Sequence, residues 1–248
     1  MSEPGPTTHF GYRTVREEEK SRLVRDVFDS VAPRYDLMND LMSLGIHRLW
    51  KARFLDRVRP RPRQTLLDVA GGTGDISFGW RERGGGPVMV CDINKEMLAV
   101  GRDRAIDRNI LSGIDWICGD AEALPLPDRS VDAYTIAFGL RNVTHIDQAL
   151  AEARRVLRPG GRFHCLEFST VMLPALAAIY DRYSFSVLPW LGELVAGDAP
   201  AYRYLAESIR RFPAQADLAA KMEEAGLRRA DWINLSGGIA AMHSGWRL

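Results

Sequence analysis

The chain has 248 residues, which is enough for one large α/β domain with its own hydrophobic core. With 33 basic and 32 acidic side chains its net charge is +1, so no excess of positive charge favours nucleic acid as a partner. Three scattered cysteines argue against a disulfide framework, and the five histidines form no metal-ligand spacing with them. We expect the cysteines to be buried neutral thiols and predict no metal.

The N-terminal segment predicts neither a targeting peptide nor a membrane anchor. It opens without a cationic start or an apolar run, and no apolar run in the chain reaches the ~18 residues that span a bilayer. We therefore expect a cytoplasmic protein. The first predicted element is an amphipathic helix that ends near Pro33. Its apolar side chains recur at helical spacing, at Leu23, Val24, Val27, Phe28 and Val31. We expect a helical cap over about 15–58 that packs as a lid.

From Thr65 onward, predicted strands and helices alternate, which is typical of a doubly wound, mostly parallel sheet. The predicted strands are Thr65–Val69, Pro87–Cys91, Ile114–Cys118, Ala133–Phe138 and Arg162–Phe168, with closing strands at Leu227–Leu235 and Ile239–His243. The predicted helices are Asp75–Arg83, Lys95–Ile106, Ile146–Leu157 and Leu218–Ala225. A helical insertion over about 171–211 follows the fifth strand. We thus predict a Rossmann-like, seven-stranded α/β fold in a single domain over 1–248.

The most informative feature is a glycine-rich turn after the first predicted strand. That strand leads into Gly71-Gly72-Thr73-Gly74, and Asp92 ends the next strand about 20 residues further on. Glycines let the backbone approach a ligand closely, and a carboxylate in that position accepts both ribose hydroxyls of an adenosine group. The pattern predicts an adenosine pocket. A tight strand-to-helix turn without a ligand is the alternative.

Two cofactors with an adenosine group compete for this pocket. A dinucleotide fold carries a third glycine, and the N-terminus of its helix receives a pyrophosphate. Here Ser77 stands in place of that glycine, and Asp75 would meet the pyrophosphate with a like charge. S-adenosylmethionine carries a cationic amine and a sulfonium instead, which acids such as Asp68 and Asp75 suit better. We therefore favour S-adenosylmethionine over NAD.

Two further loops follow the third and fourth strands and reach the same edge of the sheet. In the first, Asp120 is placed to accept the exocyclic amine of an adenine, and the small Ala121 leaves room for the ring; a plain turn cap is the alternative. In the second, Arg141 and Asn142 are placed to hold an oxyanion or a hydroxyl. From its position alone, Arg141 is equally well interpreted as a surface arginine.

Several segments spread over nearly the whole length carry a family resemblance. They are Tyr35–Ser43, Gly45–Trp50, Ala70–Asp75, Phe138–Val143 and Tyr202–Ile209. With these segments the chain resembles the ubiquinone/menaquinone biosynthesis C-methyltransferases, a family of class I methyltransferases. The glycine motif is shared with many methyltransferases, whereas the other segments together are specific to this family. The resemblance implies S-adenosylmethionine as the cofactor and an antiparallel last strand in the sheet.

The glycine turn and the resemblance together give a predicted set of cofactor contacts. The set is Asp68, Gly71, Gly72, Thr73, Gly74, Asp92, Ile93, Asp120, Ala121 and Ala137. The family often has Asn where Asp120 stands and Ser where Ala137 stands. Asp120 keeps an acceptor for the adenine, whereas Ala137 lacks the serine hydroxyl and is left with its backbone.

The resemblance implies methylation of a ring carbon of a polyprenylated quinol, either 2-polyprenyl-6-methoxy-benzoquinol or demethylmenaquinol or both. We predict that Arg141 stabilises the ionised ring hydroxyl and that Asn142 orients it. The alternatives are a different phenolic or lipid acceptor, or a cofactor-binding subunit of a quinone-biosynthesis complex. Three side chains are candidates for a general base, with water as the alternative: Asp36, His47 and Tyr180.

The polyprenyl tail gives a reason for the apolar stretch at 171–196. We predict that this stretch makes peripheral contact with the inner face of the membrane or lines a groove for the tail. The sequence leaves open whether the chain acts alone, as a homodimer or within a complex of quinone-biosynthesis enzymes.

Overall fold

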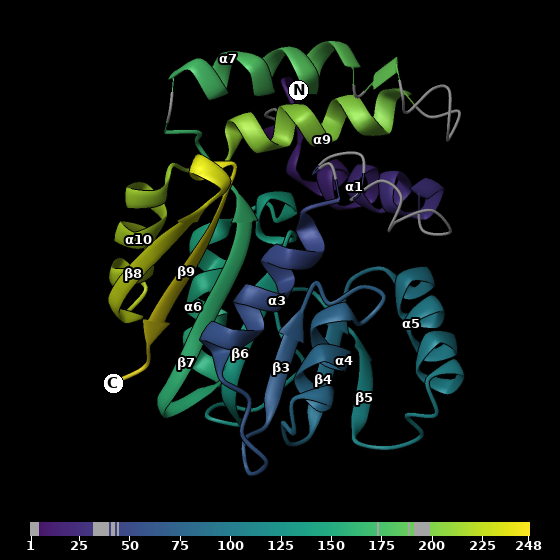
Figure 1. The fold of residues 1–248 in the computed structure, drawn as a ribbon, viewed down its shortest axis with the longest axis vertical. Helices are drawn as coiled ribbons and strands as arrows, with labels where there is room; N and C mark the ends of the chain where they lie inside the picture. The colour runs from purple at the N-terminus through teal and green to yellow at the C-terminus, as the bar shows by residue number, and fades with distance from the viewer. Residues whose placement is uncertain are drawn as a thin grey trace.

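The computed structural model describes residues 5–31, 40, 43, 45–172, 174–187, 189–190 and 199–248. A seven-stranded sheet in the order β5-β4-β3-β6-β7-β9-β8 runs through it (Figure 1). The strands are β3 (Leu66–Val69), β4 (Val88–Asp92), β5 (Ile114–Cys118), β6 (Val131–Ala137), β7 (Leu157–Phe168), β8 (Arg228–Leu235) and β9 (Ala240–Trp246). The first five are parallel, and β9 is antiparallel to both of its neighbours. The predicted fold class and the antiparallel last strand are confirmed.

Helices cover both faces of this sheet. One face packs against α3 (His47–Val58), α4 (Asp75–Glu82) and α5 (Lys95–Asp107), and the other against α6 (Ile146–Val156) and α10 (Gln215–Glu224) (Figure 1). Because side chains alternate along a strand, Leu66 enters the first core and Leu67 the second, and both are fully buried. The hydrophobic run of β3 is thus explained by burial on two faces.

The N-terminal segment differs from the prediction. A hairpin of β1 (Thr7–Phe10) and β2 (Arg13–Arg16) precedes α1 (Glu17–Val31). We did not predict this hairpin, because its strands are short and mostly exposed and so lack a clear apolar alternation. Three acidic residues in the first turn of α1, Glu17 to Glu19, complement the helix dipole.

The predicted insertion is helical where it is described. It contains α7 (Pro174–Arg182), the π-helix η3 (Tyr183–Val187) and α9 (Ala199–Arg211), and α7 and α9 lie above the carboxyl edge of the parallel strands (Figure 1). No helix in the described ranges is long and apolar enough to cross a membrane.

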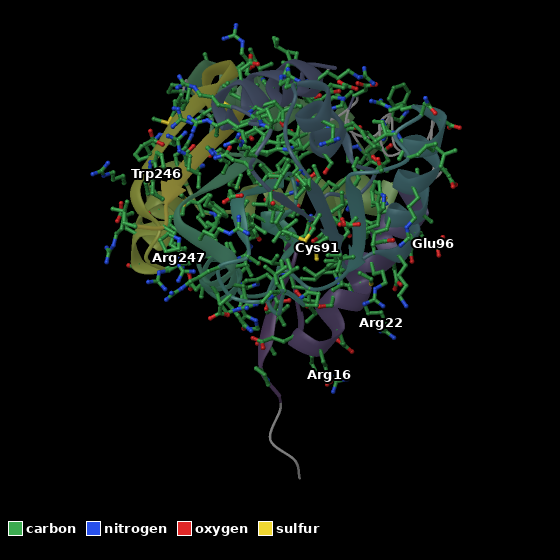
Figure 2. All side chains as sticks on the ribbon, turned by 90° about the horizontal axis from the view of Figure 1, so that it is seen from below. Arg16, Arg22, Cys91, Glu96, Trp246 and Arg247 are labelled. Atoms are coloured by element: carbon green, nitrogen blue, oxygen red, sulfur yellow. The ribbon has the colours of Figure 1, made fainter. Side chains whose placement is uncertain are left out.

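The cysteine prediction is right for two residues and wrong for the third. Cys91, at the centre of the molecule in Figure 2, and Cys165 are buried, and burial raises the pKa of the Cys91 thiol to about 12. Cys118 is exposed because it ends the edge strand β5.

Candidate functional site

A cleft of about 790 Å³ opens at the carboxyl edge of the sheet, where open α/β folds bind their ligands. Its walls come from the ends of β3, β4 and β5, from the loop after β6, and from one side of α1. Six of the predicted site residues line it, namely Gly72, Asp92, Ile93, Asp120, Ala121 and Asn142. The structure thus brings together the four predicted loops around one cleft.

The glycine turn clasps the carboxylate of Asp92. Gly72 has a φ of +52° and donates its backbone N–H to Asp92 Oδ2 at 2.9 Å, and Asn94 donates its own to Oδ1 at 2.9 Å. A side chain at Gly71 would place Cβ 2.7 Å from Val90 Cγ1, so the turn needs glycine there. Because a carboxylate has about four acceptor sites, Asp92 retains capacity for two more donors, such as a pair of ribose hydroxyls.

Burial raises the pKa of Asp92 to about 6, which leaves it mostly ionised at neutral pH. Next to it, Ile93 and the small Ala121 line an apolar part of the cleft, and Asp120 lies beside them. Asp120 Oδ1 accepts the backbone N–H of Glu122 at 2.9 Å. This turn fixes the carboxylate of Asp120 at the cleft wall and leaves Oδ2 to accept a ligand amine. The acceptors and walls of the cleft therefore fit an adenosine group.

Other predicted cofactor residues do not line the cleft. Asp68 is buried under the turn, where its two oxygens accept hydroxyls from Ser77 at 2.7 Å and Thr135 at 2.8 Å. The hydroxyl of Thr73 accepts from Arg104 at 2.6 Å. Gly71, Gly74 and Ala137 are likewise absent from the lining. Direct cofactor contact by these five residues stays a prediction; here they build the turn and the strand end behind it.

Asp75 is not the free acid that we assumed when we favoured S-adenosylmethionine over NAD. Its carboxylate pairs with Lys51 at 2.7 Å and with Arg104 at 2.8 Å, and these two cations hold its pKa at about 2 despite its burial. These two ion pairs connect the N-terminus of α4 to α3 and to α5. Asp75 therefore offers less attraction to a cationic ligand than its sequence position indicated.

The buried Asp68 gives the stability of the fold a defined pH dependence. Burial raises its pKa to about 6, above the ordinary value of about 3.9, so between pH ~4 and ~6 the folded chain binds more protons than the unfolded chain. The free energy of unfolding contributed by Asp68 therefore falls as the pH rises through this window. We expect Asp68→Asn to be more stable than the wild type at pH 8 by about 1–3 kcal/mol, with little difference near pH 4. Urea unfolding at both pH values measures this, and equal stabilities at pH 8 would contradict it.

The short helix η2 (Leu140–Asn142) contains both predicted catalytic residues, and their side chains point in different directions. Arg141 turns away from the cleft and is almost completely buried; its Nη1 donates to Glu167 Oε1 at 2.8 Å and to the carbonyl of Phe138 at 2.5 Å. Burial raises the pKa of Glu167, and the Arg141 guanidinium opposes that shift. The ion pair fixes the turn around Phe138, a non-glycine residue with φ +57°. A direct contact of Arg141 with substrate remains a prediction.

Asn142 points into the cleft, and its orientation is set from α9. Tyr204 donates its hydroxyl to Asn142 Oδ1 at 3.0 Å, and the Tyr204 ring stacks on Phe10 of the hairpin with 4.1 Å between ring centroids. Because this bond uses the amide oxygen, the amide NH₂ of Asn142 is oriented to donate to a ligand oxygen.

The candidate bases lie in different places. His47 is buried and its Nε2 contacts Asp40 Oδ1 at 2.9 Å, while burial lowers its pKa. Tyr180 is buried under Arg210, and burial raises its pKa to about 12. Neither residue lines the cleft. Asp36 lies outside the described residues, as does most of the segment Tyr35–Ser43.

Sequence reasoning missed several residues of the cleft. Ser21 and Arg25 of α1 line it beside Val24 and Phe28, which were predicted only as the apolar side of the lid helix. Asn94 lines it too; its side chain caps α5 by accepting the N–H of Met97 at 3.0 Å and donates to Asp29 of α1 at 2.7 Å. The signal for Asn94 was available, since asparagine at the start of a helix is a strong cap.

Comparison with known proteins agrees with these observations. Residues 13–247 match the ubiE/COQ5 methyltransferase family. A ubiquinone/menaquinone biosynthesis C-methyltransferase of Rhodopseudomonas palustris (strain HaA2) is 59% identical, over 100% of both chains. A mitochondrial 2-methoxy-6-polyprenyl-1,4-benzoquinol methylase of Danio rerio is 52% identical, over 100% of this chain and 86% of the other.

Solved structures share the fold at low sequence identity. A SAM-dependent methyltransferase from Aquifex aeolicus covers 80% of this chain, and 89% of its own chain, with a TM-score of 0.58 and 17% identity. The [4+2]-cyclase SpnF covers 92% of this chain, and 96% of its own chain, with a TM-score of 0.62 and 17% identity. Since proteins with different reactions share this fold, the assignment depends on the sequence match. That match extends over nearly the whole chain, which belongs to the ubiE/COQ5 methyltransferase family.

Proposed function

We propose that this chain transfers the methyl group of S-adenosylmethionine to a ring carbon of a polyprenylated quinol. The cleft at the carboxyl edge supports the cofactor, because Asp92, Ile93, Asp120 and Ala121 offer what an adenosine group needs. The names of the relatives at 52–59% identity support the acceptor. The single observation that carries the proposal is the Asp92 carboxylate, held by two backbone N–H groups at the wall of the cleft.

When bound, S-adenosylmethionine supplies an electrophilic methyl group on its sulfonium. The ring carbon of a quinol becomes a good nucleophile once an adjacent hydroxyl gives its proton to water, so the protein must hold that oxygen. After the carbon bonds to the methyl group, it gives up its own hydrogen as a proton to water, and the aromatic ring is restored. We assign this task to the amide NH₂ of Asn142, with Arg141 and Glu167 fixing the turn that carries it. An oriented donor of this kind contributes about 3–4 kcal/mol to the stability of the transition state. The helix α1 over the cleft would exclude water.

The bond from Tyr204 to Asn142 is predicted to matter for turnover and not for cofactor binding. Tyr204→Phe removes the hydroxyl but keeps the ring stacked on Phe10, so the chain should remain folded. We expect kcat to fall by about tenfold, because the amide of Asn142 can then rotate, while the Kd for S-adenosylmethionine stays unchanged. Steady-state kinetics and calorimetry check both values, and an unaltered kcat would contradict the role of Tyr204.

The acceptor class is tested by comparing two quinols that share a ring. A demethylated benzoquinol with a polyprenyl tail and the same ring without a tail are offered with S-adenosylmethionine. We expect kcat/KM to be at least about 100-fold higher for the prenylated quinol, because burial of the tail adds binding energy. Equal values would contradict a polyprenylated acceptor, and cofactor binding without any turnover would indicate a subunit that needs a partner.

An exposed apolar face on the insertion supports contact with a membrane surface. Its exposed apolar side chains are Met172, Ile179, Phe185, Val187 and Trp190, of which Ile179 is 69% and Trp190 61% exposed, and the exposed Tyr12 of the hairpin contacts Phe185. Tyr12 and Phe185 stack at 6.3 Å between centroids, and the cations Arg210 and Arg211 lie against these two rings. Aromatic and apolar side chains beside cations are typical of proteins that lie on an anionic bilayer.

The membrane contact predicts a selective loss of vesicle binding. We expect the wild type to float with vesicles that contain an anionic phospholipid, and the double variant Ile179→Ser, Trp190→Ser to stay in the soluble fraction. Leu111→Ser is the matched control, because Leu111 is 74% exposed in the loop before β5, away from this face. If the wild type fails to float, or the control loses binding equally, the proposed membrane face is wrong.

A further inference from the structure

A second large groove lies on the sheet face beside α3, towards the amino ends of the parallel strands. It measures about 1280 Å³ and is bounded by α3, β7, β8 and β9. Five arginines line it, namely Arg53, Arg57, Arg59, Arg162 and Arg229, against two aspartates. The strand β9 runs antiparallel and ends here at Trp246, which Figure 2 labels, so the groove lies away from the carboxyl edge with the methyl-transfer cleft.

The two aspartates of the groove are already engaged by arginines. Asp231 accepts from Arg57 at 2.5 Å, and Asp56 lies 3.6 Å from Arg83. Within the described part of the chain no carboxylate pairs with Arg59, Arg162 or Arg229. Arg59 and Arg229 are exposed and screened by water, whereas Arg162 is half-buried, so its charge gains most from a neutralising anion.

The guanidinium of Arg162 lies close to several other cations. Its guanidinium lies over the ring of Trp246, 3.6 Å from the centroid, which fixes its plane and leaves the N–H edges free to donate. Burial lowers the pKa of Arg162, and the nearby cations Arg61, Arg59 and Arg57 lower it further. Arg59, Arg61 and Arg162 also line a smaller cavity of about 430 Å³ next to the groove. Cations from the connector before β3 and from β7 therefore lie around the same two cavities.

A buried histidine at the floor adds an unused donor. His164 lines both cavities and is only 1% exposed. Ser244 Oγ accepts a hydrogen bond from Arg57 Nε at 2.8 Å and lies 3.0 Å from His164 Nδ1. We therefore assign the serine hydroxyl as the donor of this second bond and Nδ1 as its acceptor. Burial lowers the pKa of His164 to about 3, and the neutral ring therefore carries its proton on Nε2. That Nε2 has no partner in the described part of the chain.

We propose that this groove binds a phosphate-type oxyanion, held by Arg59 and Arg162 and by the Nε2–H of His164. The five arginines outnumber the two aspartates of the groove, and the planar guanidinium forks match the geometry of phosphate oxygens. The anion is either a soluble phosphorylated compound or the headgroup of a phospholipid. The site is separate from the cleft and does not depend on the proposed methyl transfer.

The first test is a calorimetric titration of the full chain with inorganic pyrophosphate. We expect one binding site in the wild type, and a Kd raised by about tenfold or more in Arg162→Gln and in Arg59→Gln. Arg63→Gln is the matched control, because Arg63 is exposed in the same connector but lines neither cavity; its Kd should stay within about twofold. The Nε2–H proton signal of His164 should also shift on binding. Unchanged affinity for S-adenosylmethionine shows that the variants are folded.

A second titration separates the two sources of the anion. Vesicles of phosphatidylcholine with phosphatidic acid are compared with vesicles of phosphatidylcholine alone. Since the insertion can also bind acidic vesicles, the effect of Arg162→Gln decides between the two sources. Pyrophosphate binding together with vesicle binding that Arg162→Gln leaves unchanged assigns a soluble ligand, whereas a loss of binding to acidic vesicles in Arg162→Gln assigns a headgroup. The proposal is overturned if the wild type does not bind pyrophosphate and Arg162→Gln leaves vesicle binding unchanged, or if Arg63→Gln loses as much affinity as Arg162→Gln. Neither result would affect the assignment of the methyl-transfer cleft.

Discussion

Replacing Asp92 by alanine is expected to weaken S-adenosylmethionine binding by at least about 100-fold. The carboxylate would lose two charge-assisted hydrogen bonds to the ribose, and each is worth about 1.5–3 kcal/mol. The backbone N–H groups of Gly72 and Asn94 would also lose their acceptor, which loosens the turn. Since burial raises the pKa of Asp92 to about 6, the affinity of the wild type should also decrease as the pH falls below this value. Calorimetry across pH 5 to 8 measures both effects.

Two variants serve as controls for this experiment. Asp115→Ala removes an exposed carboxylate from the neighbouring strand β5 and should leave the Kd unchanged. Asp92→Asn keeps one oxygen as an acceptor and should give an intermediate Kd without pH dependence below 7. If Asp92→Ala binds S-adenosylmethionine as tightly as the wild type, Asp92 does not hold the ribose.

Replacing Arg141 by alanine should affect both stability and turnover. The variant leaves Glu167 buried without its cation, and breaking a buried pair of this kind costs about 3–5 kcal/mol of unfolding free energy. We expect turnover to fall at least about tenfold, because the turn that carries Asn142 is no longer fixed. The affinity for S-adenosylmethionine should persist, since Arg141 does not line the cleft. Urea unfolding, calorimetry and steady-state kinetics separate the three quantities.

A double variant distinguishes lost stability from lost catalysis. Arg141→Met with Glu167→Gln removes both charges and keeps similar side-chain volumes, so most of the stability should return. Turnover should stay low, because the methionine at position 141 cannot donate to the carbonyl of Phe138 and the turn is therefore not fixed. Full recovery of turnover in the double variant would contradict any catalytic need for the Arg141 charge.

Local patterns were sufficient to predict the sheet and the core of the cleft. The glycine turn and Asp92 were found because backbone conformation and strand spacing restrict those positions directly. The strands β3, β4 and β5 were located to within about two residues because they are short apolar runs between turn signals. The hairpin β1–β2 was missed because its stability comes from packing on α9, through Phe10 on Tyr204 and the N–H of Tyr12 on Glu207.

Contacts between distant segments were not predictable from the sequence. The partner of Arg141 is Glu167, which nothing in the local sequence marks, and the hydroxyl that orients Asn142 comes from Tyr204, 62 positions further on. The basic groove likewise joins the connector before β3 to β7 and β9. Arg59 and Arg61 are exposed in that connector, and only the fold brings them to a cavity that His164 also lines.

The site of methyl attachment is the most direct test of the proposed reaction. The purified chain is incubated with S-adenosylmethionine labelled in its methyl group and with a demethylated polyprenyl quinol, and the product is examined by NMR. We predict that the label appears as a methyl group on a ring carbon. A label found on a ring oxygen, or no transfer by a protein that binds S-adenosylmethionine, would contradict it.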